Sequence, residues 1–195
     1  LYESTEPFVV HYLGSSTHAP DIISTCFQSG KHVLIDGDGN AWVWIDKDIS
    51  IDYACDLLTS GALRYNGQTC TSINGAIIHP EIYNDLKNRL TERWKKVKFG
   101  NPADTDVQVG PLLDESQAEH ILSSISDSGA AILAGGHHNG NLLEPTLAAE
   151  PRKDSELVTQ GFFGPALWIA PGDIDDFTTL WRSNSYPLCA GILTD

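Results

Sequence analysis

The stretch Tyr65-Asn66-Gly67-Gln68-Thr69-Cys70-Thr71-Ser72 joins a helical pattern to a strand pattern. After it, the run from Ile73 to His79 is rich in β-prone residues and stops at Pro80. Before it, apolar residues recur at the spacing of one buried helix face, at Ile51, Ala54, Cys55, Leu58, Ala62 and Tyr65. The sequence therefore predicts a helix over residues 50–65, a strand over residues 73–79, and Cys70 in the turn between them.

A cysteine in such a turn lies beside backbone N–H groups that are not all used by the helix or the strand. Its surroundings can then favour the thiolate, which is the form that attacks electrophiles. Cys70 is accordingly a candidate nucleophile. The alternative is that Cys70 is a small buried apolar residue, as many free cysteines are.

Strands and helices alternate along the rest of the chain. Before residue 50 we expect strands over 7–13, 32–35 and 41–45, and a helix over 19–27 that ends at Gly30. After residue 79 we expect helices over 80–97, 115–126 and 174–184, a long loop over 99–114, and strands over 130–134, 143–147, 166–170 and 189–194. Such alternation is typical of an α/β domain with a mainly parallel sheet and flanking helices.

The composition narrows the class of partner. The 195 residues carry a formal charge of −14, from 26 acidic and 12 basic side chains, which disfavours binding to nucleic acid. No apolar run approaches the length of a membrane span, and no signal peptide is evident. One basic cluster follows Pro80, and we interpret it as a solvated helix face: Lys87, Arg89, Arg93, Lys95, Lys96 and Lys98.

The cysteines and the chain start add two expectations. Cys26, Cys55, Cys70 and Cys189 show no spacing of a zinc site, so no metal is expected, and we predict reduced thiols in a cytoplasmic protein. The chain begins at Leu1 and contains no Met. We therefore expect it to be an internal piece of a longer protein.

Two glycine-bearing turns could bind ligands. Gly14-Ser15-Ser16-Thr17 stands between a strand and a helix, where backbone N–H groups can receive a phosphate or form an ordinary helix cap. Asp36-Gly37-Asp38-Gly39-Asn40 begins like a calcium loop. Isoleucine or valine stands where the closing acid is required, at Ile45 or Val43, so the calcium pattern fails.

Several separated segments, in order, resemble the aldehyde dehydrogenase superfamily. Gly67-Gln68-Thr69-Cys70 is similar to the Gly-Gln-x-Cys around the family's catalytic cysteine. Further similarity lies in Val109-Gly110-Pro111-Leu112, Glu144-Pro145-Thr146, Phe163-Gly164-Pro165 and Tyr186-Pro187-Leu188-Cys189-Ala190-Gly191. The last segment departs from the usual Tyr-Gly-Leu-Ala-Ala-Gly by a proline and a cysteine.

The resemblance implies two domains and an activity. Residues 1–39 would be the C-terminal remnant of a Rossmann-like coenzyme-binding domain, and residues 40–195 a catalytic domain incomplete at its C-terminus. The Cys70 thiolate would attack a small-molecule aldehyde, hydride would pass to NAD or NADP, and a thioester would remain. Gly14, Ser15 and Phe163 would bind the coenzyme. The full-length protein would be a homo-oligomer, and this piece alone would be inactive.

Two positions depart from the family pattern. The glutamate that activates the hydrolytic water in the family corresponds to Ile35, which cannot take a proton. Asp36 is the nearest acid, but consecutive strand residues point to opposite faces, so Asp36 replaces the base only if the strand twists or bulges. The glutamate that holds a cofactor ribose corresponds to Gly161, with Gln160 beside it.

These departures leave several functions open. Deacylation could use Asp36 as base or transfer the acyl group to an acceptor such as coenzyme A. The chain could instead be a non-catalytic relative that serves as a binding or assembly module. A cysteine hydrolase using His79 or His11 is disfavoured, because His79 stands at the far end of the strand that follows Cys70.

Overall fold

The computed structural model describes Ser4, Glu6 and residues 8–195. Pro7, the first residue of the first expected strand, lies outside the described residues. The chain forms two compact units, Leu1–Asp38 and Gly39–Asp195.

The first unit is a strand–helix–strand element. Strand β1 (Val9–Leu13) leads through a 3-10 turn, η1 (Ser16–His18), into helix α1 (Ala19–Gln28), and strand β2 (His32–Asp36) follows. The two strands pair in parallel, from Val9 opposite His32 to Leu13 opposite Asp36, without a shift of register. Parallel neighbours need a crossover connection, which α1 supplies.

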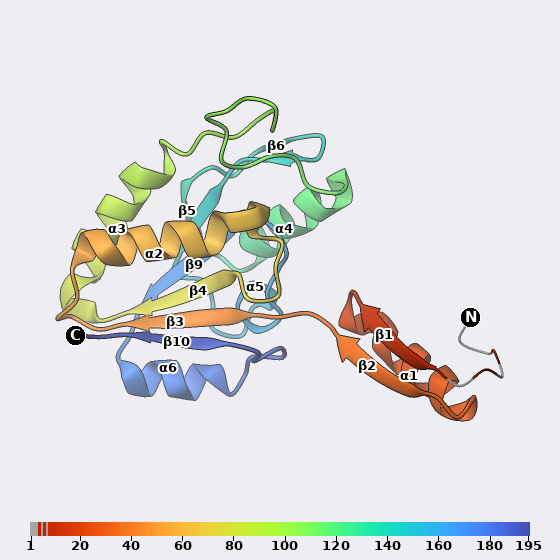
Figure 1. Ribbon diagram of the computed structural model, residues 1–195. Helices are drawn as coiled ribbons and strands as arrows, with labels where there is room; N and C mark the ends of the chain where they lie inside the picture. The colour runs from red at the N-terminus through yellow and green to blue at the C-terminus, as the bar shows by residue number, and fades with distance from the viewer. Residues whose placement is uncertain (1–3, 5, 7) are drawn as a thin grey trace. The chain divides into compact units, whose positions relative to one another are not determined.

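The second unit is built on a six-stranded sheet with the order β10-β3-β4-β9-β8-β5 (Figure 1). All pairs are parallel except β5 with β8. The predicted α/β class with a mainly parallel sheet is therefore confirmed. The strands are β3 (Ala41–Ile45), β4 (Ile73–Ile78), β5 (Ala131–Ala134), β8 (Thr146–Ala149), β9 (Ala166–Pro171) and β10 (Ala190–Leu193).

Helices cover both faces of this sheet. On one face lie α2 (Ile51–Leu63) and α3 (Pro80–Trp94); on the other lie α4 (Glu115–Asp127), α5 (Glu156–Thr159) and α6 (Ile174–Trp181) (Figure 1). Strand β3 shows why two layers are needed, since all five of its residues are buried. Its odd-numbered side chains Val43 and Ile45 pack with α2 and α3, and its tryptophans Trp42 and Trp44 pack with the opposite helices.

Three helices end two or three residues earlier than expected. Helix α2 ends at Leu63, so Tyr65 is not on its buried face; it is 68% exposed. Helices α3 and α6 each end three residues before the predicted end, at Trp94 and Trp181. Sequence periodicity marks these ends poorly, because buried residues such as Val97 continue past the last helical turn.

The strand predicted over residues 143–147 is wrong. Residues on either side of Glu144-Pro145 belong to different strands, β7 (Leu142–Leu143) and β8 (Thr146–Ala149). Strand β7 pairs with β6 (His138–Asn139), which the sequence did not indicate. Pro145 has no N–H to donate to a strand ladder, so the extended run is interrupted there.

A glycine in the central strand β4 gives a test of this packing. A Cβ on Gly75 would overlap the indole ring of Trp168 from the neighbouring strand. We expect Gly75→Ala to lower the free energy of unfolding by about 2 kcal/mol, as overpacked cores do, measured by urea denaturation. The matched control is Gly191→Ala in β10, whose Cβ would meet a Val43 methyl group at 3.1 Å. Equal stabilities of the two variants would contradict the packing argument.

Candidate active site

The chain turns sharply between α2 and Cys70. Tyr65, Asn66 and Gly67 have φ angles of 53°, 59° and 67°, in the left-handed region. Only the third is a glycine, so the other two hold a conformation that L-residues seldom adopt. The turn closes with the Gln68 N–H donating to the Tyr65 carbonyl at 3.0 Å. Strained turns of this kind persist where surrounding contacts fix them, and they are frequent at functional sites.

Asn66 and Gly67 tie this turn to two distant segments. The Asn66 side-chain oxygen accepts the Gly110 N–H at 2.9 Å. A Cβ on Gly67 would overlap the Gly164 carbonyl oxygen, so the two backbones approach too closely for any side chain at position 67. The segments around Gly110 and Gly164, which the sequence singled out separately, therefore meet at the Cys70 turn.

Gln117, from the first turn of α4, adds a third tie. Its Nε2 donates to the Phe163 carbonyl at 2.7 Å, and its Oε1 accepts from Gln68 Nε2 at 3.4 Å. Phe163 itself is half-buried. The sequence gives no sign of this role for Gln117, because a polar residue in the first turn of a helix is usually exposed to solvent.

Hydroxyl groups hold the other side of the turn. The Thr69 and Ser72 hydroxyl oxygens lie 2.7 Å apart, and the Ser72 N–H donates to the Thr69 carbonyl at 3.1 Å. Directly beyond, the Asn74 amide donates to the Phe162 carbonyl at 2.9 Å. Cys70 is thus flanked on both sides by hydrogen bonds that fix its backbone.

Gly39 packs directly against Cys70. A Cβ on Gly39 would overlap the Cys70 carbonyl oxygen. The next residue, Asn40, is fully buried, and both polar atoms of its side chain are hydrogen-bonded: its amide nitrogen donates to the Val158 carbonyl and its oxygen accepts the Trp42 indole N–H, both at 2.8 Å. The two residues before β3, Gly39 and Asn40, therefore form a fixed surface against which the Cys70 backbone packs.

Gly161 packs against Asn40, one of these two residues. Its φ is +74°, and a Cβ there would lie 2.8 Å from the Cβ of Asn40. A side chain at this position would be strained and would press on Asn40. The residue that stands where the resemblance expects a ribose-binding glutamate is thus a glycine in a conformation that suits glycine.

The four cysteines differ in access. Cys26 and Cys55 are buried, and burial raises the pKa of the Cys55 thiol. Cys70 is half-buried and Cys189 is exposed, and all four are free thiols. Reagents in solution can therefore reach Cys70 and Cys189, whereas burial blocks access to Cys26 and Cys55, and the raised pKa of Cys55 further disfavours its thiolate.

Asp36 ends strand β2 in the first unit. The β1–β2 ladder continues to Leu13 opposite Asp36 with no bulge, so alternation places the Ile35 and Asp36 side chains on opposite faces. The Asp36 carbonyl accepts the Gly14 N–H at 3.1 Å, and the Asp36 side chain is exposed. Asp36 as the general base stays a prediction.

The Gly14-Ser15-Ser16 turn already holds a carboxylate. Oδ2 of Asp38 accepts the Ser16 N–H at 2.7 Å and the Ser15 hydroxyl at 3.4 Å. In return the Asp38 N–H donates to the Ser16 hydroxyl at 2.9 Å. The donors that were expected to receive a coenzyme phosphate can therefore bind an anion, and in this structure that anion is the Asp38 side chain.

His79 has a structural contact. Its Nδ1 accepts the Glu81 N–H at 3.3 Å as the N-cap of α3. Strand β4 lies between the Cys70 turn and His79 in the chain. This supports the expectation that the protein is not a cysteine hydrolase with His79 as its base. Among the described residues, no cluster of His, Cys, Asp or Glu could hold a metal ion, and no helix is both long and apolar enough to cross a bilayer.

Comparison with known sequences gives one family. The model of the aldehyde dehydrogenase family matches residues 1–195. The 1-pyrroline-5-carboxylate dehydrogenase of Bacillus subtilis is 28% identical over 170 residues, which are 84% of this chain and 33% of that protein. The 3-sulfolactaldehyde dehydrogenase of Priestia aryabhattai is 29% identical over 169 residues, 85% of this chain and 35% of that protein. The chain thus spans about a third of the length of these relatives.

Solved structures agree in fold. The lactaldehyde dehydrogenase of Escherichia coli is 25% identical, with a TM-score of 0.90 over 96% of this chain and 41% of that one. PnpE, solved in complex with nicotinamide adenine dinucleotide, has a TM-score of 0.92 at 22% identity, over 100% of this chain and 42% of that one.

Gly39→Ala tests the close contact between Gly39 and the Cys70 backbone. The added methyl group must push the Cys70 backbone away, which loosens the turn and exposes the half-buried thiol. We expect the rate of Cys70 alkylation by iodoacetamide, followed by peptide mass spectrometry, to rise about three-fold or more. The control is Gly140→Ala, where a Cβ has no neighbour within 4 Å. An unchanged rate at Cys70 in Gly39→Ala would show that the contact does not hold the turn.

Proposed function

Because this chain belongs to the aldehyde dehydrogenase family, we propose that it supplies the cysteine nucleophile and part of the coenzyme site of an enzyme that oxidises a small aldehyde with NAD or NADP. It does so as part of a longer chain, since it spans about a third of its curated relatives. By itself the 195-residue chain is expected to be inactive. The full-length protein is expected to be a cytoplasmic homo-oligomer.

One observation carries the proposal. The turn at Cys70 is the meeting point of segments that lie 40 to 100 residues further along the chain, through Gly110, Gln117 and Gly164. A buried structural cysteine needs no such support. A nucleophile does, because small displacements of an attacking atom reduce the rate strongly.

The chemistry assigned to this chain's residues begins at the thiol. Cys70 Sγ attacks the aldehyde carbon, the C=O electron pair moves to oxygen, and the backbone N–H of Cys70 donates to the resulting oxyanion. A bound NAD or NADP would supply the acceptor for the hydride that this carbon loses. Collapse of the oxyanion then leaves a thioester on Cys70. Phe163 is proposed to lie beside the nicotinamide riboside, and Gly14 and Ser15 to contact a coenzyme phosphate.

Release of the acyl group is where this chain departs from its family. Ile35 cannot accept a proton, and the continuous register of β2 gives Asp36 the opposite face. Two routes remain proposed: water activated by Asp36, or transfer to another nucleophile such as coenzyme A. The absence of a base at residue 35 favours acyl transfer.

The substrate is proposed to be a small aldehyde. The names of the relatives and of a structural neighbour refer to pyrroline carboxylate, sulfolactaldehyde and lactaldehyde. These are small and polar molecules. We extend only that class to this protein.

Rapid-mixing kinetics on the longer protein tests both points. With an aldehyde and NAD, we expect a burst of about one NADH per subunit, then little turnover until coenzyme A is added. Cys70→Ser should abolish the burst, while Cys189→Ser should leave it unchanged. A burst that survives Cys70→Ser would overturn the proposed nucleophile. Steady carboxylate formation that Asp36→Asn abolishes would instead assign hydrolysis with Asp36 as base.

A non-catalytic binding or assembly module is the second candidate. It is favoured by the combination of Ile35 with Gly161. The left-handed backbone at residue 161 suits glycine, and a side chain there would crowd Asn40. Cys70 alkylation at neutral pH separates the two candidates. A rate at Cys70 above that of the more exposed Cys189 supports catalysis, because exposure alone would favour Cys189; a slower rate supports the module.

Asp38 gives a prediction about the coenzyme. Its carboxylate takes the Ser16 N–H and Ser15 hydroxyl, so a coenzyme phosphate must displace an anion from the turn. We expect Asp38→Gly in the longer protein to tighten NAD binding about ten-fold, measured by calorimetry. Asp36→Asn is the charge-matched control and should change affinity little, since that side chain makes no contact with the turn donors. Weaker binding by Asp38→Gly would contradict the competition.

A further inference from the structure

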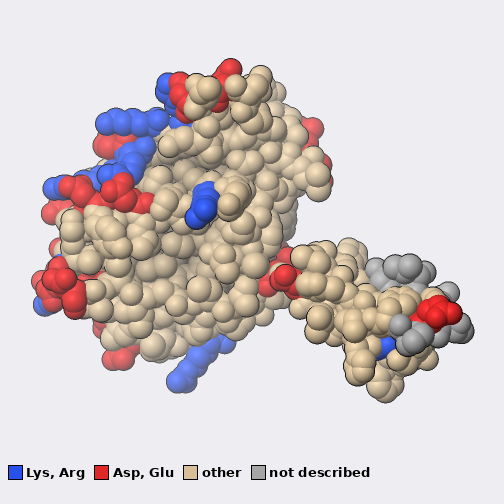
Figure 2. Space-filling model, in the orientation of Figure 1, with Lys and Arg blue, Asp and Glu red and all other residues tan. Residues whose placement is uncertain are grey.

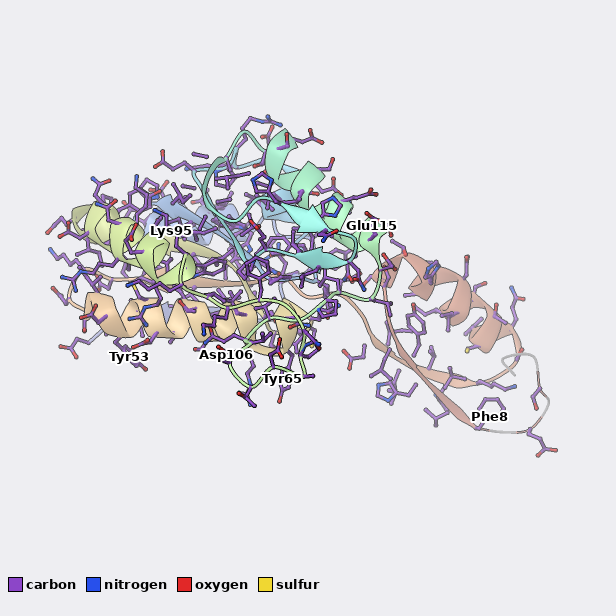
Figure 3. All side chains as sticks on the ribbon, turned by 90° about the horizontal axis from the view of Figure 1, so that it is seen from above. Phe8, Tyr53, Tyr65, Lys95, Asp106 and Glu115 are labelled. Atoms are coloured by element: carbon purple, nitrogen blue, oxygen red, sulfur yellow. The ribbon has the colours of Figure 1, made fainter. Side chains whose placement is uncertain are left out.

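A basic hollow lies in the second unit; its lining does not include Cys70, although Arg64 directly precedes the Cys70 turn. It has a volume of about 570 Å³ and lies between α2, the C-terminal end of α3 and the loop that follows α3. Figure 3 labels Tyr65 and Asp106, which belong to the segments after α2 and α3. The lining residues on α2 and its C-cap are Asp56, Thr59, Ser60, Leu63 and Arg64; the others are Arg93, Lys96, Val97 and Gln108.

The charge of this hollow is opposite to that of the chain. The whole sequence carries −14, yet the lining has three cations, Arg64, Arg93 and Lys96, and one acid, Asp56. In Figure 2 the basic side chains gather over the region that α3 occupies in Figure 1, interleaved with acidic ones. A positive hollow on an acidic protein attracts small anions selectively, because the remaining surface repels them.

Most of the basic helix face is already neutralised. Of its six basic residues, five form ion pairs in the structure: Lys87 with Glu150, Arg89 with Asp52, Arg93 with Asp56, Lys95 with Glu92, and Lys98 with Asp106. The interpretation of this face as a merely solvated one is therefore incomplete, because Lys96 is the exception. It forms no salt bridge among the described residues, although its charge interacts with Glu92 one helical turn earlier, and it lines the hollow.

Arg64 is the second cation without a counter-ion. Its guanidinium lies over the Tyr65 ring at 5.1 Å and pairs with no acid among the described residues. It follows directly on the last residue of α2, Leu63. Arg93, although paired with Asp56, has five N–H donors, and one carboxylate cannot use them all.

Neutral groups complete the site. The hydroxyl oxygen of Thr59 is buried and has no hydrogen-bond partner in the described structure, which is costly unless a ligand or water supplies one. Gln108, from the loop after α3, also lines the hollow. Leu63 and Val97, both nearly buried, give the hollow an apolar floor.

We propose that this hollow binds a small phosphate monoester, with Arg64, Lys96 and the free donors of Arg93 around the phosphate and the carbon portion against Leu63 and Val97. Guanidinium forks and an ammonium group are the side chains that bind phosphate most strongly. The volume exceeds that of inorganic phosphate alone and leaves room for a few carbon atoms. This proposal does not rest on the proposed catalytic function.

Calorimetric titration of the longer protein that contains this chain tests the site. With glycerol phosphate as probe we expect millimolar or tighter binding in low salt. The double variant Arg64→Gln/Lys96→Gln should weaken it about ten-fold, because two charge-assisted contacts are lost. Lys95→Gln is the matched control: it removes the same charge from the neighbouring residue, whose ammonium pairs with Glu92 and not with the hollow. It should leave binding unchanged.

Three other measurements keep the proposal falsifiable. Circular dichroism of each variant confirms that folding is retained, and a variant that unfolds is replaced by the single changes Arg64→Lys and Lys96→Ala. Glycerol is the uncharged probe and should not bind. Equal loss of binding in Lys95→Gln would mean non-specific attraction, and would overturn the site. So would absence of binding to the unmodified chain, or citrate binding more tightly than glycerol phosphate.

Discussion

The carbonyl oxygen of Cys70 occupies the space in which any side chain at residue 39 would begin. A second backbone contact of the same kind joins Gly67 to Gly164. Between these two close approaches the turn has almost no freedom, and Tyr65 and Asn66 adopt left-handed conformations to enter it. The position of the Cys70 backbone is thus set by these close approaches between backbones, and hydrogen bonds on both sides of the turn hold it there. The segments around Gly110, Gln117 and Gly164 bring these backbones together.

That requirement explains why distant motifs had to be read jointly. Gly110, Gln117 and Gly164 come from a loop, a helix and the approach to a strand, and each contributes one contact to the same turn. The glycines at 67 and 164 were visible in the sequence because they belong to a family pattern. Gln117 was not visible, and Gly39 was noted only as part of an acidic turn, since neither hydrogen bonding across the fold nor backbone proximity leaves a local signal.

Secondary structure followed the same division. Buried strands such as β3 were predictable, because five consecutive apolar residues admit few other interpretations. The strand across residues 143–147 was wrong because Pro145 interrupts an otherwise β-prone run. The predicted end of α2 was wrong because Tyr65 has the spacing of the buried face but already has a left-handed φ angle. Hydrophobic periodicity does not detect such a change of backbone conformation. The carboxylate of Asp38 in the Ser16 turn was also invisible, since it depends on the pairing of β1 with β2.

The order of the six-stranded sheet has one more consequence. Strand β10 is one of its two edge strands, the other being β5; β10 is bonded to β3 on one side, and its Ile192 side chain is 62% exposed. A terminal strand presents a row of backbone donors and acceptors, and a hydrophobic one is a template for pairing with a strand of another molecule. Prepared alone, this polypeptide would therefore tend to self-associate along β10 as its concentration rises, whatever its chemistry at Cys70.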